Sequence, residues 1–241
     1  MTGLSQVQNP IGENKYNSLI VRLDHRFAHG LMLNTHYEWA HTMSRDWFPN
    51  SFDSQPVWQE SDSSRPLRWV VTGVYDLPFG KGRPVLRNSR LGNALVGGWQ
   101  LGVAFQRQSG ECIDFGNQFW YGSDYRDIVL PSNERTQDHW FNTDLFERSS
   151  SRAPSSFNRR VFPNRMNWLR TANLTQLDAN LVKGIPIRER ITASLRLDLI
   201  NALNHPVIGN PNVNPLDSGF GRVTAFVNAA RLIQLTFRLS Y

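Results

Sequence analysis

Long apolar runs are missing from this sequence of 241 residues. A membrane-spanning helix needs roughly 20 consecutive apolar residues, whereas apolar patches such as Trp69–Val71 are soon interrupted by Arg, Asp, Gln or Gly. A bundle of spanning helices is therefore excluded. A membrane β-barrel is not excluded, because its strands are apolar only at alternate positions.

Lysine and glutamate are scarce. Lys15, Lys81 and Lys183 are the lysines among the 26 basic residues, and Glu occurs seven times against 21 Asn, 17 Gly and 13 Pro. This composition favours strands and turns over helices. The net charge is +6, but the arginines are scattered, whereas a nucleic-acid surface needs basic residues clustered on one face. We therefore expect no nucleic-acid partner.

Cysteine is nearly absent, and a leader is not recognisable. With Cys112 alone, an internal disulfide and a cysteine-based zinc site are excluded. Residues 1–10 contain no basic segment followed by an apolar segment, which a secretory signal requires. If the protein lies outside the cytoplasm, we expect its start to be missing from this chain.

Alternation with a period of two residues is abundant, and it is typical of strands with one apolar and one polar face. At the C-terminus, Ile233, Leu235, Phe237, Leu239 and Tyr241 alternate with Gln234, Thr236, Arg238 and Ser240. Six other segments show the same pattern: 18–27, 31–39, 67–76, 99–108, 177–181 and 191–199. His29 and Gly30 predict a hairpin turn between the first two. The sequence predicts an all-β fold, an antiparallel meander of about seven long strands.

Strand length indicates a membrane. Most of these runs have about 9–12 residues, close to the ~9–11 that a tilted strand needs to cross a bilayer and longer than the ~5–6 of soluble strands. Aromatic residues lie on the apolar faces, mostly near strand ends, as in an interfacial girdle; these are Trp39, Trp69, Tyr75, Trp99 and Tyr241. A soluble β-sandwich also alternates and is the alternative, although it explains the strand length poorly.

The connections alternate strictly in length along the chain. The shorter ones are residues 28–30, 77–98 and 183–189, and the long polar ones are 43–65, 109–171 and 201–230. Outer-membrane barrels place short turns on the periplasmic side and long loops outside. With a periplasmic C-terminus, every shorter connection falls on the periplasmic side, which favours transmembrane strands.

Several segments resemble one receptor family. They are 73–82, 97–101, 195–206 (LRLDLINALNHP), 209–212, 220–224 and the closing 233–241. In this order they resemble Oar-like TonB-dependent outer-membrane receptors, which are abundant in Acidobacteria. The similarity spans most of the chain beyond Tyr16 and is weaker between Glu111 and Arg170.

The resemblance implies a 22-stranded barrel, the class of about 22 strands with a plugged lumen. Residues 1–241 would then be its last seven strands, without the plug and signal sequence. It implies energised uptake or export of a large ligand in the outer membrane of a Gram-negative bacterium. The implied partners are outer-membrane lipid and the barrel assembly machinery, with the TonB–ExbB–ExbD complex contacted only through the missing N-terminal part.

Motifs for catalysis or metal binding are weak, and we expect neither an enzyme nor a cofactor. Residues 80–83 (GKGR) lack the P-loop spacing, and no G-x-S-x-G elbow or zincin motif is present. His36 and His41 are an odd number of residues apart, so they face opposite sides of a strand. An outer-membrane barrel hydrolase remains an alternative, because a catalytic triad is defined by geometry.

Loop oxygens offer calcium ligands, although turns explain them more simply; they belong to Asp124, Asp127, Asn210, Asn212, Asn214 and Asp217.

Two candidate sites remain. The first is the C-terminal strand, because assembly machinery captures an unpaired strand by β-augmentation, and the resemblance implies that the signal is alternate apolar residues ending in an aromatic one. Ile233, Leu235, Phe237, Leu239 and Tyr241 fit it. The second is a set of loop aromatics that either contact a ligand or pack within their loop: Phe119, Trp120, Tyr121 and Tyr125.

Overall fold

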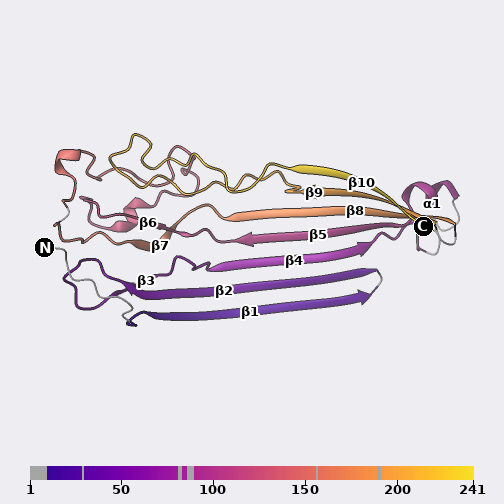
Figure 1. The fold of residues 1–241 in the computed structure, drawn as a ribbon, viewed down its shortest axis with the longest axis horizontal. Helices are drawn as coiled ribbons and strands as arrows, with labels where there is room; N and C mark the ends of the chain where they lie inside the picture. Colours follow the sequence, from indigo (N-terminus) through magenta and orange to yellow (C-terminus); the bar gives the residue numbers. More distant parts are fainter. Residues whose placement is uncertain (1–9, 29, 81–82, 86–89, 156, 189–190) are drawn as a thin grey trace.

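The fold is an antiparallel meander of long strands (Figure 1). The computed structural model describes residues 10–28, 30–80, 83–85, 90–155, 157–188 and 191–241. Seven strands follow one another through the sheet: β1 (Glu13–Ala28), β2 (Leu31–Trp47), β4 (Leu67–Asp76), β5 (Trp99–Gln108), β8 (Leu174–Arg188), β9 (Ile191–Ile200) and β10 (Leu232–Ser240). The predicted seven-strand meander is confirmed.

Three strands are longer than their sequence patterns predicted. β1, β2 and β8 have 16, 17 and 15 residues. β1 and β2 stay paired as far as Glu13 and Arg45, and β2 also pairs with the short β3 (Val57–Glu60). The connection predicted at 183–189 was therefore too long, because β8 continues to Arg188. Pairing with a neighbouring strand sustained these extensions where the alternation of side chains had ended.

The soluble-sandwich alternative is contradicted by the arrangement of the sheets. Within the described residues, the other sheet has two short strands, β6 (Cys112–Asp114) and β7 (Arg165–Arg170). A sandwich needs two extended sheets packed face to face. Here no second extended sheet covers the apolar side of the large sheet in the described residues, and Leu235 on β10 is 69% exposed.

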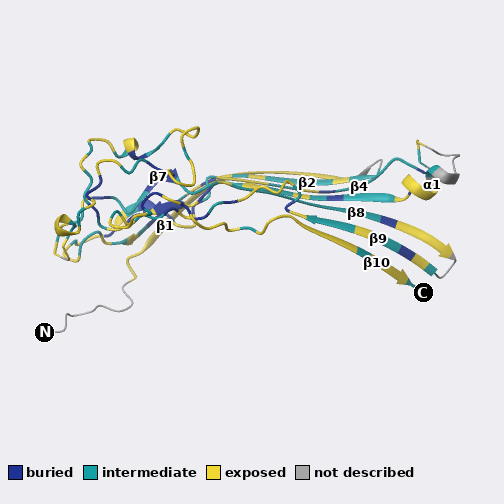
Figure 2. Cartoon of the chain, turned by 90° about the horizontal axis from the view of Figure 1, so that it is seen from above, coloured by how far each residue is buried: buried dark blue, intermediate teal, exposed yellow. Residues whose placement is uncertain are grey.

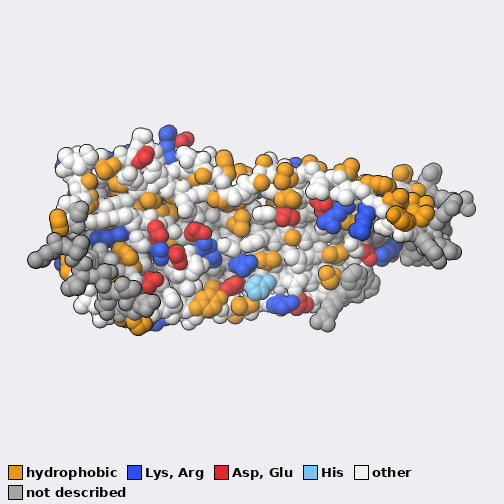
Figure 3. Space-filling model, viewed as in Figure 1, with side chains coloured by type: hydrophobic (Ala, Val, Ile, Leu, Met, Phe, Trp, Pro, Cys, Tyr) orange, Lys and Arg blue, Asp and Glu red, His pale blue; other side chains and the backbone are white. Residues whose placement is uncertain are grey.

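Strand register sorts the side chains of the large sheet onto two faces. One row of paired residues runs across six strands, namely Leu31, Tyr75, Leu101, Leu181, Leu197 and Leu235. We call this side the apolar face. The polar face carries Asp178, Arg196 and Asp198, with Arg196 paired to Asp198 at 2.8 Å. The view of Figure 3 shows charged side chains over the strands. The predicted alternation of β9 and β10 is confirmed, because their register is unbroken.

The two ends of the sheet differ (Figure 1). The β1–β2, β4–β5 and β8–β9 connections and the C-terminus lie at one end, which we call the turn end. At the β1–β2 turn, Gly30 has a φ of 82° and a Cβ there would lie 3.2 Å from that of Asp76, so a larger residue would be strained at this position. Its predicted partner, His29, lies outside the described residues.

A short helix, α1 (Arg90–Val96), lies in the β4–β5 connection. Residues 77–98 were predicted only as a connection, and a seven-residue segment containing Gly92 and Asn93 carries little helical propensity. No helix among the described residues is long and apolar enough to span a membrane.

The buried core lies outside the large sheet, at the opposite end (Figure 2). It is a cluster of eleven side chains from the long loops and the β6–β7 pair: Ile113, Phe115, Ile128, Trp140, Phe141, Phe146, Phe162, Met166, Leu169, Phe220 and Val223. We call the three loops around it the first (48–66), second (109–173) and third loop (201–231), and together they form the cap. Hydrophobic burial therefore stabilises the cap.

Candidate functional site

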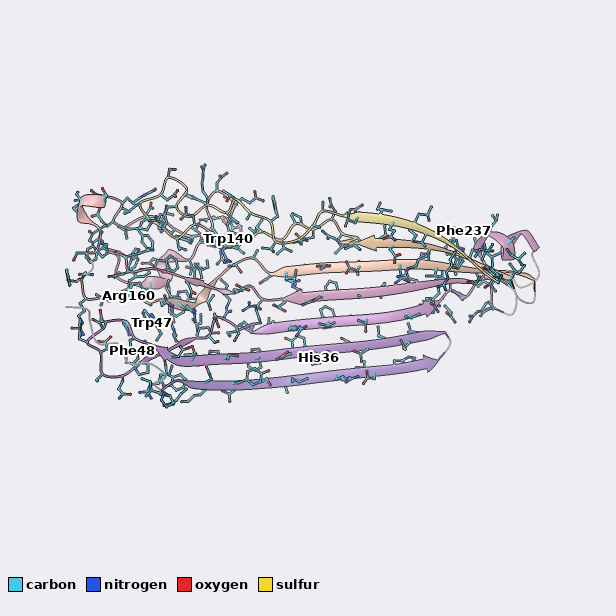
Figure 4. The ribbon with its side chains drawn as sticks, viewed as in Figure 1. His36, Trp47, Phe48, Trp140, Arg160 and Phe237 are labelled. Atoms are coloured by element: carbon cyan, nitrogen blue, oxygen red, sulfur yellow. The ribbon has the colours of Figure 1, made fainter. Side chains whose placement is uncertain are left out.

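The second and third loops of the cap share an aromatic core. Phe220 of the third loop packs edge to face against Phe141 and Phe146, with ring centroids 5.3 and 5.1 Å apart. The amide of Trp140 donates to the carbonyl of Gly221 at 2.9 Å, and Figure 4 places Trp140 among these loops. Aromatic pairs of this geometry add stability beyond their buried area. The two loops therefore form one folded body.

A buried ion pair joins the first loop to the second. Glu60, on β3, is 3% exposed and accepts from Arg170 at 2.6 Å and from the hydroxyl of Ser64 at 2.5 Å. Arg170 also donates to the carbonyls of Ser64 and Gly110. His41 contacts the other Glu60 oxygen at 2.9 Å. We call these residues the clasp, and because its charges are paired and hydrogen-bonded, it holds the two loops together.

A cleft of about 530 Å³ opens between the first and second loops. Its lining includes Trp47, Asn50, Gln55 and Arg159. The guanidinium of Arg160 lies 4.5 Å from the ring of Trp47 and donates to the carbonyl of Phe162 at 3.0 Å. Figure 4 shows Trp47 and Arg160 together at the cap end. Arg160 therefore shapes the wall of the cleft, and the exposed Arg159 leaves its charge available at the rim.

The predicted loop aromatics have separate roles in the structure. Trp120 and Tyr125 pack against the core cluster, and the centroids of their rings lie 5.1 Å apart. Tyr121 is exposed, and its hydroxyl donates to Glu147 at 2.8 Å. A hydrogen bond from the Ser149 amide lowers the pKa of Glu147, and the bond from Tyr121 lowers it further. Packing within the loop accounts for two of the four residues, and a ligand contact of Phe119 or Tyr121 stays a prediction.

Loop side chains that were weighed as calcium ligands accept backbone amides in turns. The side-chain oxygen of Asp124 accepts the Arg126 amide, that of Asn212 the Asn214 amide, and that of Asp217 the Gly219 amide. These are Asx-type turns, which is the simpler explanation weighed above. Within the part of the chain that the structure describes, no group of three His, Cys, Asp or Glu side chains is suited to a metal ion.

Asn201, within the resembling segment 195–206, lies at the start of the third loop. This residue is buried, has a φ of 52°, and accepts the His205 amide through its side-chain oxygen. Its side-chain nitrogen donates to the carbonyl of Ala229 at 3.0 Å. Asn tolerates the left-handed conformation better than most residues. Asn201 therefore ties together the two ends of the third loop.

Cys112 lies inside the cap and gives a direct test of its packing. It is 7% exposed, and burial raises the pKa of its thiol to about 11. Because the thiolate is the reactive form, we expect N-ethylmaleimide at pH 8 to label the assembled protein far more slowly than the urea-unfolded protein. Labelling rises only as the pH approaches that raised pKa. A Tyr121→Cys variant in a Cys112→Ser background is the exposed control, and equal labelling rates at the two positions would contradict the packing.

The predicted assembly strand is the edge strand β10. Ile233, Leu235, Phe237 and Leu239 pair with Leu199, Leu197, Leu195 and Ala193 of β9 and share the apolar face. Tyr241 follows the strand and is fully exposed. In the described part of the sheet, β10 has β9 as its partner on one side, so its other edge is free to pair. This geometry suits β-augmentation, and the assembly role itself stays a prediction.

Changing Tyr241 tests that role. We expect Tyr241→Ser to cause a large loss of folded protein from outer-membrane fractions, whereas Tyr241→Phe and Ser240→Ala leave near-normal levels. The physical reason is that an aromatic ring suits the membrane interface and ends the strand that the machinery templates. Normal levels for Tyr241→Ser would remove Tyr241 from the assembly signal.

An uncovered apolar face, a polar face, short connections at one end and folded loops at the other define a segment of an outer-membrane β-barrel. A family model described as an outer membrane beta barrel domain matches residues 2–234, and the chain belongs to this family. No curated protein and no solved structure matches it. Family membership implies the outer membrane of Gram-negative bacteria, and we expect the apolar face to contact lipid and the polar face to line the barrel interior.

Proposed function

We propose that this chain is the C-terminal part of the barrel of an Oar-like TonB-dependent receptor. The complete barrel has about 22 strands around a plug domain, and it mediates energised uptake or export of a large ligand. The proposal includes no catalytic step and no cofactor. Its partners are outer-membrane lipid, the barrel assembly machinery and, through the N-terminal part, the TonB–ExbB–ExbD complex.

The folded cap is the observation that carries the proposal. A pore that only admits small solutes needs no large folded surface above its mouth, whereas a receptor must hold its ligand there before transport. The cap has its own aromatic core, a buried clasp and a cleft of about 530 Å³. A rigid scaffold that presents loops is the usual arrangement for a binding surface. The ordered series of resembling segments supports the receptor group in particular.

Capture by TonB tests the proposal. The complete polypeptide that contains this chain is extracted in detergent and mixed with the periplasmic domain of TonB from the same bacterium. We expect a stable complex, because TonB must engage the receptor to energise it. We also expect cells without this protein to lose an energy-dependent uptake that cells without TonB lose as well.

Two results together contradict the proposal. They are that the assembled protein binds no TonB, and that deleting its gene changes no energy-dependent uptake. That result would leave an outer-membrane barrel of another kind. An Arg159→Ala variant changes the rim of the cleft without touching the barrel strands, and it serves as the control for assembly and TonB binding. We expect it to assemble and to bind TonB normally.

A further inference from the structure

Helix α1 is held against the apolar face at the turn end of the sheet. The ammonium of Lys183, on β8, donates to the carbonyls of Ala94 and Leu95, the latter at 2.9 Å. The indole N–H of Trp99, on β5, donates to the same Leu95 carbonyl at 2.9 Å. Trp99 and Lys183 are a cross-strand pair, in one row with Leu195 and on the same face as Leu101. The C-terminal end of α1 therefore lies on the side of the sheet that contacts lipid.

The contact satisfies two groups that lipid does not tolerate alone. A lysine on the lipid face of a barrel is costly near the bilayer midplane and less so toward the interfaces, and the last carbonyls of a helix have no partner within the helix. Lys183 is only 7% exposed, with its ammonium 5.4 Å from the Trp99 ring centroid. The positive charge also meets the negative end of the helix dipole. In water both groups would be solvated without each other.

Along the strands, the contact between Lys183 and α1 lies between rows of apolar side chains on the apolar face. The next row of the apolar face toward the turn end contains Ile185, Ala193 and Leu239. The lipid-compatible surface thus continues past Lys183, and the end of α1 lies beside it. Leu95 is 70% exposed, and Val96 is exposed as well. These exposed apolar side chains lie at the end of the helix that Trp99 and Lys183 hold against the apolar face, the face for which the family implies lipid contact.

We propose that α1 is an interfacial helix that binds the phospholipids of the periplasmic leaflet. Leu95 and Val96 contact acyl chains, and the hydrogen bonds from Lys183 hold the end of the helix against the barrel wall. An apolar helix surface at the boundary between headgroups and acyl chains is the usual mode of such binding. The inference rests on the outer-membrane family and on a periplasmic turn end. It does not depend on TonB or on any ligand.

Accessibility of a spin label on α1 tests the inference. Leu95→Cys in a Cys112→Ser background carries a nitroxide label in outer-membrane vesicles. Leu235→Cys is the lipid reference and Tyr121→Cys the water reference. We expect the ratio of oxygen to nickel-chelate accessibility at Leu95 to lie within about twofold of that at Leu235. A ratio equal to that at Tyr121 would place α1 in periplasmic water and overturn the proposal, and Val96→Cys gives the same readout if Leu95→Cys fails to assemble.

A second substitution tests the contact between Lys183 and the end of α1. Lys183→Met removes the charge that binds the two carbonyls, so we expect the label on α1 to become more mobile and its accessibility to move toward the water reference. Lys15→Met is the matched control, because Lys15 also lies over a tryptophan ring, 4.3 Å from the centroid of Trp58, but near the cap. We expect it to leave the label unchanged. An unchanged label in Lys183→Met would remove Lys183 from the proposal.

Discussion

Leu197→Arg should lower the assembled, heat-modifiable fraction of the protein much more than Arg196→Leu does. Leu197 lies in the apolar row between Leu181 and Leu235. An arginine on the lipid face of a barrel costs about 2–4 kcal/mol near the bilayer midplane, because lipid offers the charge neither water nor a partner.

Arg196→Leu should be mild. Arg196 lies on the polar face, and its side chain is about half exposed, so its ion pair with Asp198 is screened by water. Such exposed pairs contribute about 0–1 kcal/mol. The measurement is the heat-modifiable band of the complete protein in outer-membrane fractions, for both variants at equal expression. Equal losses for the two variants would mean that the assignment of the faces is wrong.

The second large effect is expected at the clasp. Arg170→Met should open the contact between the first and second loops while the barrel strands remain folded. Removing one partner of a buried ion pair costs about 3–5 kcal/mol, because the other charge is left buried. Glu60 would keep Ser64 and His41 as partners but lose its guanidinium. The measurement is cleavage of the first loop by a protease added to intact cells, with heat-modifiability as the test of barrel folding.

Arg222→Met is the matched control for the clasp. Arg222 pairs with Asp138 at 3.2 Å between the third and second loops, but both side chains are more than half exposed. We expect little change in cleavage, because exposed pairs contribute little. The double variant Glu60→Leu with Arg170→Met should recover much of the protection, since no buried charge is left alone. Equal cleavage of the Arg170→Met and Arg222→Met variants would show that the clasp does not hold the cap.

The sequence predicted those parts of the candidate sites whose residues follow a repeating pattern. β10 was identified from its own residues, because alternation is visible in any extended strand. The clasp was missed, since Glu60 and Arg170 are isolated charges in irregular loops and no spacing links them. The cleft was missed for the same reason. Of the loop aromatics, the sequence located all four but left open which of them pack inside the loop.

The sequence by itself determined the number, order and facing of the long strands. Side chains of a strand alternate between its two faces, so a lipid boundary on one side leaves a period of two residues in the sequence. The short and long connections determined which ends of the strands lie together. Only the tertiary structure decided the rest. Phe115, Phe141 and Phe220 meet in the cap core, and Lys183 meets α1, through contacts between distant segments without regular geometry. Such contacts leave no periodic pattern in a sequence, because they depend on how the loops fold against one another.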